Sequence, residues 1–127
     1  MMNFAKDVVF NLTKIDNSKI NKNVAATLVD GEQVIGVYKT VRDQVVFTDK
    51  RIITVDVQGL TGKKQEIFTI PYARIDYYAI QTPGFLEINA DSELVISFTN
   101  GLKAEFEFKG NCDIRQISKM IATYALR

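Results

Sequence analysis

The sequence predicts a mainly β domain with flanking helices, and three observations support this prediction. Between residues 33 and 108, apolar and polar residues alternate with a period of two, as they do in strands that bury one face. Turn-forming residues interrupt this stretch at short intervals, which is typical of a sandwich or a small barrel. On either side the apolar residues have helical spacing. The 127 residues fit one domain with a substantial core, and two domains would each be too small.

Two short helices are predicted at the N-terminus. The apolar face of the first comprises Phe4, Val8, Leu12 and Ile15. After a break at residues 16–17, the spacing recurs in Ile20, Val24 and Leu28. Ser18 is a candidate N-cap of the second helix, and Asp30-Gly31 is its candidate end. We therefore expect residues 1–31 to form a helical segment that packs on the main domain, residues 32–127, or on a neighbouring copy.

The hairpin around Asp49 and Lys50 carries apolar residues on both faces. A two-residue turn there places Phe47 opposite Ile52, with Val45 on the same side. The other side carries Val46, Ile53 and Val55. Either the N-terminal helices or a neighbouring subunit must cover this second face, and both satisfy the hydrophobic requirement equally well. The three residues on that side are therefore candidate interface residues.

The hairpin at Asn100 and Gly101 has two possible registers. A two-residue turn would pair Phe98 with Lys103 and mix apolar and charged groups on one face. A three-residue loop pairs Phe98 with Leu102 instead, and we predict this register, with Gly101 in a left-handed conformation at a bulge. The other apolar pairs would be Ile96 with Ala104 and Leu94 with Phe106. The residues left facing water would be Lys103, Glu105 and Glu107.

An amphipathic helix from about Asp113 to Ala125 is predicted to close the chain. Its apolar stripe comprises Ile114, Ile117, Ile121 and Tyr124. The residues that lie away from this stripe are Arg115, Lys119 and Thr123. Asp113 fits the N-cap position, with Gln116 as its partner in a capping box. The apolar stripe is expected to cover one end of the strand region.

The stretch from residue 46 to residue 75 contains the segments FTDKR, QGLTGKK and IPYARI in this order. Their wording and spacing resemble the bacterial pleckstrin-homology-like (PH-like) domain family, roughly over residues 32–126. The resemblance implies a PH-like barrel of about seven antiparallel strands with a C-terminal capping helix. It also implies assembly as a ring or another symmetric homo-oligomer. Tyr77 and Tyr78 are candidate interface residues, because adjacent strand residues face opposite sides and one ring would point outward.

The composition argues against catalysis and metal binding. The chain has no histidine and a single cysteine, Cys112, so it lacks the commonest general base and the commonest transition-metal ligand. We predict no catalytic residues, no metal, no cofactor and no enzymatic activity. Cys112 precedes the last helix, where the helix dipole could lower its pKa, but a packing role is the favoured interpretation.

Charge and targeting signals limit the partners and the compartment. The formal net charge is +1, so we expect no nucleic-acid partner. Lys6 and Asp7 interrupt the N-terminal apolar stretch, which argues against a signal peptide. With one cysteine and no stretch that could span a bilayer, the expected location is the cytoplasm.

A local anion site is predicted from the resemblance. If the first four strands form a meander, the turn at Arg42 and the loop with Lys63 and Lys64 meet at one end of the sheet. PH domains that bind phosphoinositides hold the headgroup between the corresponding loops. The resemblance therefore implies an anion site comprising Lys39, Arg42, Lys63 and Lys64. The first loop is short and the strand QVVFT lacks an R-x-R pattern, so we expect only weak attraction to anionic membranes.

These observations predict a non-enzymatic module that self-assembles and serves as a protein-interaction or scaffolding unit. Strand edges left free by an open barrel would serve assembly by strand addition. The protein partner is not identified by the sequence. The alternative function is weak binding of an anionic ligand or a phospholipid headgroup at the basic loop end.

Overall fold

The computed structural model describes residues 8–83, 91–110 and 112–126, with side chains from Asn11 onward. The strands are β1 Val8–Ile15, β2 Val34–Lys39, β3 Gln44–Thr48, β4 Arg51–Gln58, β5 Lys64–Pro71, β6 Ile75–Gln81, β7 Ser92–Phe98 and β8 Lys103–Phe108. The helices are the short 3₁₀ turns η1 Asn17–Lys19 and η2 Tyr72–Arg74, and the α-helices α1 Lys22–Thr27 and α2 Ile114–Ala125.

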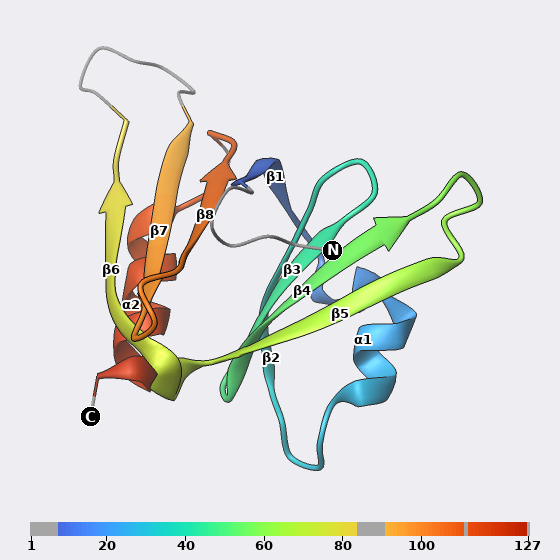
Figure 1. Cartoon of the computed structure of the whole chain (residues 1–127), viewed down its shortest axis with the longest axis horizontal. Coiled ribbons are helices and arrows are strands. Elements are labelled where there is room, and N and C mark those ends of the chain that lie inside the picture. Colours follow the sequence, from blue (N-terminus) through green and yellow to red (C-terminus); the bar gives the residue numbers. More distant parts are fainter. Residues whose placement is uncertain (1–7, 84–90, 111, 127) are drawn as a thin grey trace.

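The eight strands form one open sheet in the order β5-β4-β3-β2-β1-β8-β7-β6. Neighbouring strands are antiparallel, except that β1 and β8 are parallel. The chain turns at η2, so β5 and β6 follow one another in sequence but lie at the two edges of the sheet (Figure 1). The mainly β prediction is confirmed. The described chain contains eight strands rather than about seven, and the sheet stays open between β5 and β6.

The predicted first helix is wrong, because Val8–Ile15 forms β1 in the middle of the sheet. β1 pairs with β2 and β8, and Asn11, with a φ of 61°, lies where its pairing with β8 shifts. Leu12 packs into the core on one face of the sheet, whereas Ile15 packs against the core on the other. The apolar residues of one strand thus serve two faces, and their spacing imitates a helix. Phe4, also in the predicted stripe, lies outside the described residues.

The second predicted helix is present as α1, with different ends. Its N-cap is Asn21 rather than Ser18, because the Asn21 side chain accepts hydrogen bonds from the backbone N–H groups of Asn23 and Val24. Ser18 belongs to the preceding turn η1. α1 ends at Thr27, before the predicted end.

The sheet buries apolar residues on both of its faces. The main core includes Leu12, Phe47, Ile52, Ile70, Leu94, Ile96, Phe106, Phe108, Ile117 and Ile121. A second core comprises Val24, Val37, Val46, Ile53 and Val55. α2 contributes to the main core and α1 to the second, so the two helices cover opposite faces of the sheet (Figure 1). Each aliphatic side chain buried in this way contributes about 1.5–3 kcal/mol.

Both predicted hairpin registers are confirmed. The pairs are Phe47–Ile52 and Val46–Ile53 in β3–β4, and Ile96–Ala104 and Leu94–Phe106 in β7–β8. The Phe98 N–H donates to the carbonyl of Leu102, and Gly101 has a φ of +85°, which favours glycine. The side chains on the other face of β8 are exposed at Lys103 and Glu105 and half-buried at Glu107.

The C-terminal helix is confirmed as α2, which packs against β6, β7 and η2. The Asp113 carboxylate caps it by accepting a hydrogen bond from the Arg115 N–H. Its buried residues are Ile114, Ile117 and Ile121. Tyr124 stacks on Tyr72 with ring centroids 5.5 Å apart, so α2 is also fixed to the turn between β5 and β6.

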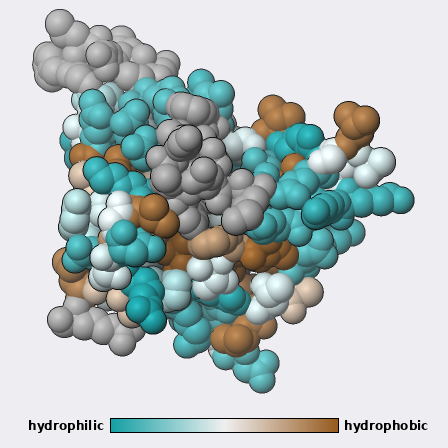
Figure 2. All heavy atoms as spheres, in the orientation of Figure 1, coloured by the Kyte–Doolittle hydropathy of each residue, from teal (hydrophilic) through white to brown (hydrophobic). Residues whose placement is uncertain are grey.

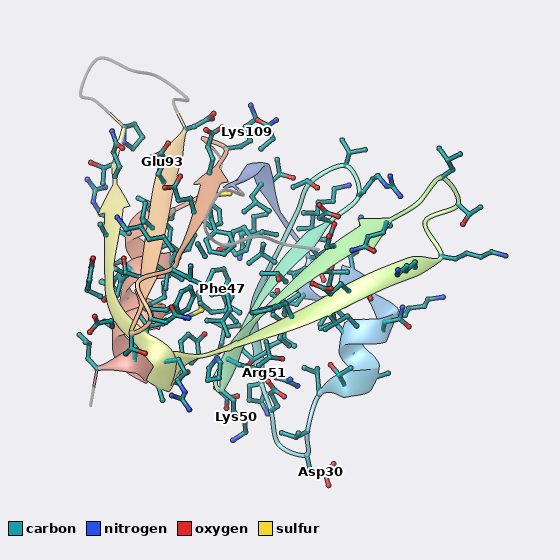
Figure 3. The ribbon with its side chains drawn as sticks, in the orientation of Figure 1. Asp30, Phe47, Lys50, Arg51, Glu93 and Lys109 are labelled. Atoms are coloured by element: carbon teal, nitrogen blue, oxygen red, sulfur yellow. The ribbon has the colours of Figure 1, made fainter. Side chains whose placement is uncertain are left out.

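A buried ion pair joins the segment before β2 to the β3–β4 hairpin. The Arg51 guanidinium donates to both carboxylate oxygens of Glu32, at 3.0 and 3.1 Å, and the Thr48 hydroxyl donates at 2.6 Å. Burial raises the pKa of Glu32, but these hydrogen bonds and one from the Val29 N–H outweigh it and lower that pKa to about 2. Figure 3 shows Arg51 beside Lys50 at this end of the hairpin.

Candidate functional site

The β2–β3 turn and the β4–β5 loop lie beside each other at the end of the sheet opposite this ion pair (Figure 1). The Arg42 guanidinium donates a hydrogen bond to the Gly59 carbonyl across the two loops. The Asp43 carboxylate accepts one from the Val57 N–H of β4. These contacts follow from the β2–β5 meander, which returns every second connection to the same end of the sheet.

The four predicted anion-site residues lie at or near this loop end. Their side chains are exposed at Lys39, Arg42, Lys63 and Lys64. Arg42 is held by its hydrogen bond to the other loop, whereas Lys63 and Lys64 lie where that loop enters β5. The positive charge is therefore spread over two projecting loops, and Asp43 and Asp56 nearby offset part of it.

Two aliphatic side chains project from the same loops, and the sequence reasoning missed them. Val41 in the first loop and Leu60 in the second are fully exposed, at 101% and 107%. Figure 2 shows two separate hydrophobic protrusions at this end, each surrounded by more hydrophilic surface. Large aliphatic residues at both tips were detectable in the sequence, but only the structure places the tips side by side.

The predicted interface residues fall into two groups. Val46, Ile53 and Val55 are almost completely buried in the second core, where α1 covers them through Val24. Within one copy, α1 therefore covers this face of the hairpin. The adjacent tyrosines of β6 differ from each other: the side chain of Tyr77 is 60% exposed, whereas Tyr78 packs against the main core.

The two edges of the sheet are the other exposed feature. β5 pairs with β4 along all eight of its residues without a shift in register, and β6 pairs with β7 with a shift between Ile75 and Tyr77. Neither edge strand has a second partner among the strands that the structure describes. Their outer backbone N–H and C=O groups can therefore accept an added strand.

Cys112 precedes α2 as expected, but its surroundings do not activate the thiol. Burial raises the pKa of Cys112, and the thiol lies 3.6 Å from the Leu12 carbonyl. A raised pKa keeps the sulfur protonated and weakly nucleophilic near neutral pH. The packing interpretation agrees with this environment.

Within residues 8–83, 91–110 and 112–126, histidine, cysteine and carboxylate side chains form no group of three that could hold a metal ion. None of the helices in these ranges is long and apolar enough to cross a membrane.

Both a family model and a curated protein match nearly the whole chain. The family model described as bacterial PH domain matches residues 3–125. The chain is 34% identical to the uncharacterized protein YjqA of Bacillus subtilis (strain 168), over 98% of this chain and all of that protein. The match includes β1 and α1, which the sequence reasoning had separated from the resemblance to PH-like domains.

Two solved structures have a similar fold. The crystal structure of a DUF1696 family protein with a pleckstrin-homology domain from Shewanella loihica PV-4 has a TM-score of 0.78 and 30% identity, over 92% of this chain and 99% of that chain. A pleckstrin homology domain from Shewanella amazonensis SB2B has a TM-score of 0.66 and 37% identity, over 89% of this chain and 90% of that chain.

Proposed function

Because the chain belongs to the bacterial PH domain family, we propose that it is a non-catalytic binding module that assembles with copies of itself through the edges of its sheet. The observation that supports this proposal is the pair of free edges, β5 and β6, at the two ends of an open eight-stranded sheet. An edge strand gains main-chain hydrogen bonds when another strand is added to it. An assembly of this kind would present repeated copies of one surface to a protein partner.

The composition of the β6 edge favours association, whereas β5 carries Lys64, Glu66 and Pro71. Natural edge strands are commonly blocked by lysine, proline or inward-pointing charges. The β6 sequence contains one charge, Asp76, and the five residues that follow it carry none. Tyr77 adds an exposed aromatic ring, a good anchor for a subunit contact. When β6 of one copy adds to β5 of the next, the contact is heterologous and gives a ring if the rotation closes.

A lysine in the middle of the β6 edge is expected to reduce assembly. Ala79 is exposed on β6, and Ala79→Lys adds a charge that must be desolvated when another strand pairs there. We expect the dissociation constant of the assembly to rise about tenfold or more, which corresponds to about 1.4 kcal/mol. Sedimentation velocity over a dilution series measures this change.

Ala26→Lys on α1 is the matched control, since Ala26 is also exposed and the substitution is chemically identical. It is expected to leave the mass distribution unchanged. If both variants weaken assembly equally, or if Ala79→Lys does not weaken it, then β6 is not an assembly edge.

A second candidate function is weak attachment to an anionic membrane at the loop end. The observation that favours it is the combination of the exposed aliphatic tips, Val41 and Leu60, with the flanking cations Arg42, Lys63 and Lys64. Basic residues near a negatively charged leaflet contribute about 1 kcal/mol each. Exposed aliphatic side chains add the free energy of leaving water at the membrane interface.

Vesicle co-sedimentation tests this second function. The double variant Lys63→Glu, Lys64→Glu is expected to lower binding to phosphatidylserine vesicles about tenfold or more, because it removes two attractive charges and adds two repulsive ones. Lys103→Glu and Lys119→Glu, which reverse two exposed lysines on β8 and α2, are the charge-matched control. Unchanged binding of the loop variant, or equal binding of the protein to neutral vesicles, would exclude the electrostatic attachment.

A further inference from the structure

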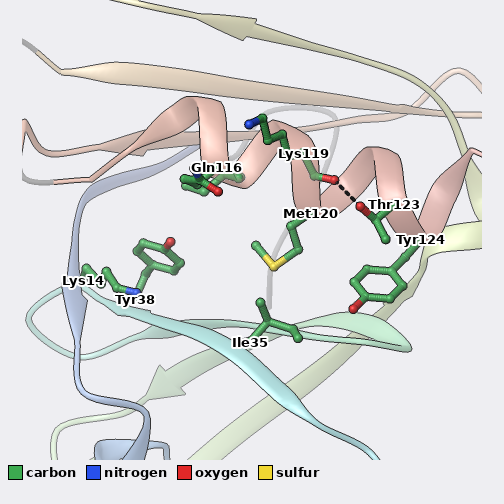
Figure 4. Close-up of a pocket in the computed structure, with 9 residues that line it drawn as sticks. Lys14, Ile35, Tyr38, Gln116, Lys119, Met120, Thr123 and Tyr124 are labelled. Atoms are coloured by element: carbon green, nitrogen blue, oxygen red, sulfur yellow. Dashed lines mark hydrogen bonds between the residues drawn. The ribbon is translucent and has the colours of Figure 1, made fainter.

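A groove of about 450 Å³ lies between α2 and the strands β1 and β2, away from both the free edges and the basic loops. Figure 4 shows its two ends. Polar groups from Lys14, Tyr38 and Gln116 gather at one end, and Ile35, Met120 and Tyr124 line the rest. The volume lies in the range of small-molecule sites, and the lining combines polar side chains with the apolar side chains of Ile35, Ile117 and Met120.

Tyr38 forms a rigid floor at the polar end. Its side chain is almost fully buried, with 5% exposed, and its ring packs edge-on against Phe47 and Phe108, with centroids 5.6 and 5.2 Å away. Gly36 leaves room for this ring, since a Cβ there would lie 3.2 Å from Cε2 of Tyr38 and 3.5 Å from its hydroxyl oxygen. A fixed aromatic ring thus holds the hydroxyl in one place.

The Tyr38 hydroxyl reaches the surface of the groove, although the Tyr38 ring is packed on two sides. Within residues 11–83, 91–110 and 112–126, no other group forms a hydrogen bond with it. The hydroxyl is therefore a donor that a bound group could use. In Figure 4 it points from β2 towards α2 across the groove. Burial, with smaller effects from Cys112 and Asp113, raises the pKa of Tyr38 to about 12, so the hydroxyl keeps its proton near neutral pH.

The charged groups around the groove are cationic. The Lys14 ammonium lies 5.8 Å from the centroid of the Tyr38 ring, and Lys119 stands on the rim. The described lining of the groove contains these two lysines and no carboxylate. Asp113, the acid that affects Tyr38, is occupied as the cap of α2. The groove is therefore suited to an anionic group at the Tyr38 end.

We propose that this groove binds a small amphipathic carboxylate, such as a medium-chain fatty acid. The carboxylate accepts a hydrogen bond from the Tyr38 hydroxyl and pairs with the Lys14 ammonium. The hydrocarbon tail lies between Ile35 on β2 and Met120 and Tyr124 on α2, where it covers apolar surface that is now partly exposed. The proposal does not depend on self-assembly or on membrane attachment.

Titration of the full chain with octanoate, followed by two-dimensional amide and methyl NMR, tests the proposal. We expect saturable shifts at Ile35, Ile117 and Met120. Octanol, which has the same chain length and no charge, is expected to bind about tenfold more weakly, because it lacks the charge-assisted contacts. Binding of both probes with equal affinity would contradict the proposed carboxylate contact.

Two variants separate the polar contacts from the apolar ones. Tyr38→Phe keeps the packed ring and removes the hydroxyl, and Lys14→Gln removes the charge from an exposed position. Each is expected to weaken octanoate binding about tenfold and to leave octanol binding unchanged. Lys103→Gln on the opposite end of the strand region is the control and is expected to bind like the native chain.

Other results would overturn the proposal. They are the absence of saturable shifts at millimolar octanoate, equal octanoate affinity in the native chain and both groove variants, and shifts that map outside the groove. If subunits pack over this groove, octanoate will fail to bind the assembled protein, and that result also counts against the proposal.

Discussion

Replacing Glu32 with alanine is expected to lower the free energy of unfolding by about 3–5 kcal/mol. The Glu32 side chain is fully buried and the Arg51 side chain is 19% exposed, so removal of the carboxylate leaves a guanidinium largely withdrawn from water without its ion-pair partner. The Val29 N–H loses its side-chain acceptor as well, and the Thr48 hydroxyl is left with the Arg51 carbonyl. Urea unfolding followed by circular dichroism measures the change.

The control for this variant is Glu105→Ala, which removes an exposed carboxylate from β8. It is expected to change the unfolding free energy by less than about 0.5 kcal/mol. A loss below about 1 kcal/mol in Glu32→Ala would show that the ion pair contributes no more than a surface pair.

The same carboxylate predicts how stability depends on pH. The pKa of Glu32 is about 2 in the folded chain and 4.5 in an unperturbed one, so the folded state favours the ionised form. The contribution of the ionised Glu32 side chain to the free energy of unfolding is complete above pH 4.5 and is lost as the pH falls towards 2. Below pH 4.5 the native chain is therefore expected to lose stability more steeply than Glu32→Gln, which cannot titrate. Parallel curves for the two proteins would contradict this assignment.

Replacing Val24 with aspartate is expected to lower the free energy of unfolding by about 3 kcal/mol or more and to release α1 from the sheet. Val24 is completely buried, and it closes the second core over Val46, Ile53 and Val55. A carboxylate at this position would lie among the apolar side chains of that cluster. Urea unfolding measures the loss, and hydrogen exchange of the β3 and β4 amides reports the uncovering of the sheet.

Ala26→Asp on the exposed side of α1 is the matched control, because it introduces the same charge into the same helix. It is expected to lower the free energy of unfolding by less than about 1 kcal/mol, because aspartate has a lower helix propensity than alanine. If Val24→Asp is as stable as this control, then α1 does not supply the cover of the outer face. A subunit contact would then be required there.

The β7–β8 hairpin could be predicted from the sequence because only one of its two possible registers places apolar residues opposite one another. The register with Phe98 opposite Leu102 also pairs Ile96 with Ala104, and Gly101 supplies the left-handed residue that this loop needs. β1 could not be predicted in the same way, since Leu12 and Ile15 face different cores and produce the spacing of a helix. In β1, apolar residues that face different cores therefore concealed the strand period of two.

Contacts between distant segments were the part of the site that the sequence did not reveal. Glu32 resembles any charged residue before a strand, and its low pKa depends on Arg51 and Thr48 in another hairpin. Val41 and Leu60 are likewise ordinary loop residues until the meander brings their loops together. The Tyr38 hydroxyl points towards helix α2, which lies far along the chain from Tyr38, so the sequence does not show that the two meet at a groove.

Assembly through the sheet edges is the central proposal, and the mass in solution tests it most directly. Size-exclusion chromatography with light scattering, over a range of concentrations and at two salt levels, gives that mass without a standard. The account predicts a defined multiple of the 14.3 kDa chain that is maintained at the higher salt level, because edge pairing relies on backbone hydrogen bonds rather than on surface charge. A mass of 14.3 kDa at every concentration would contradict it.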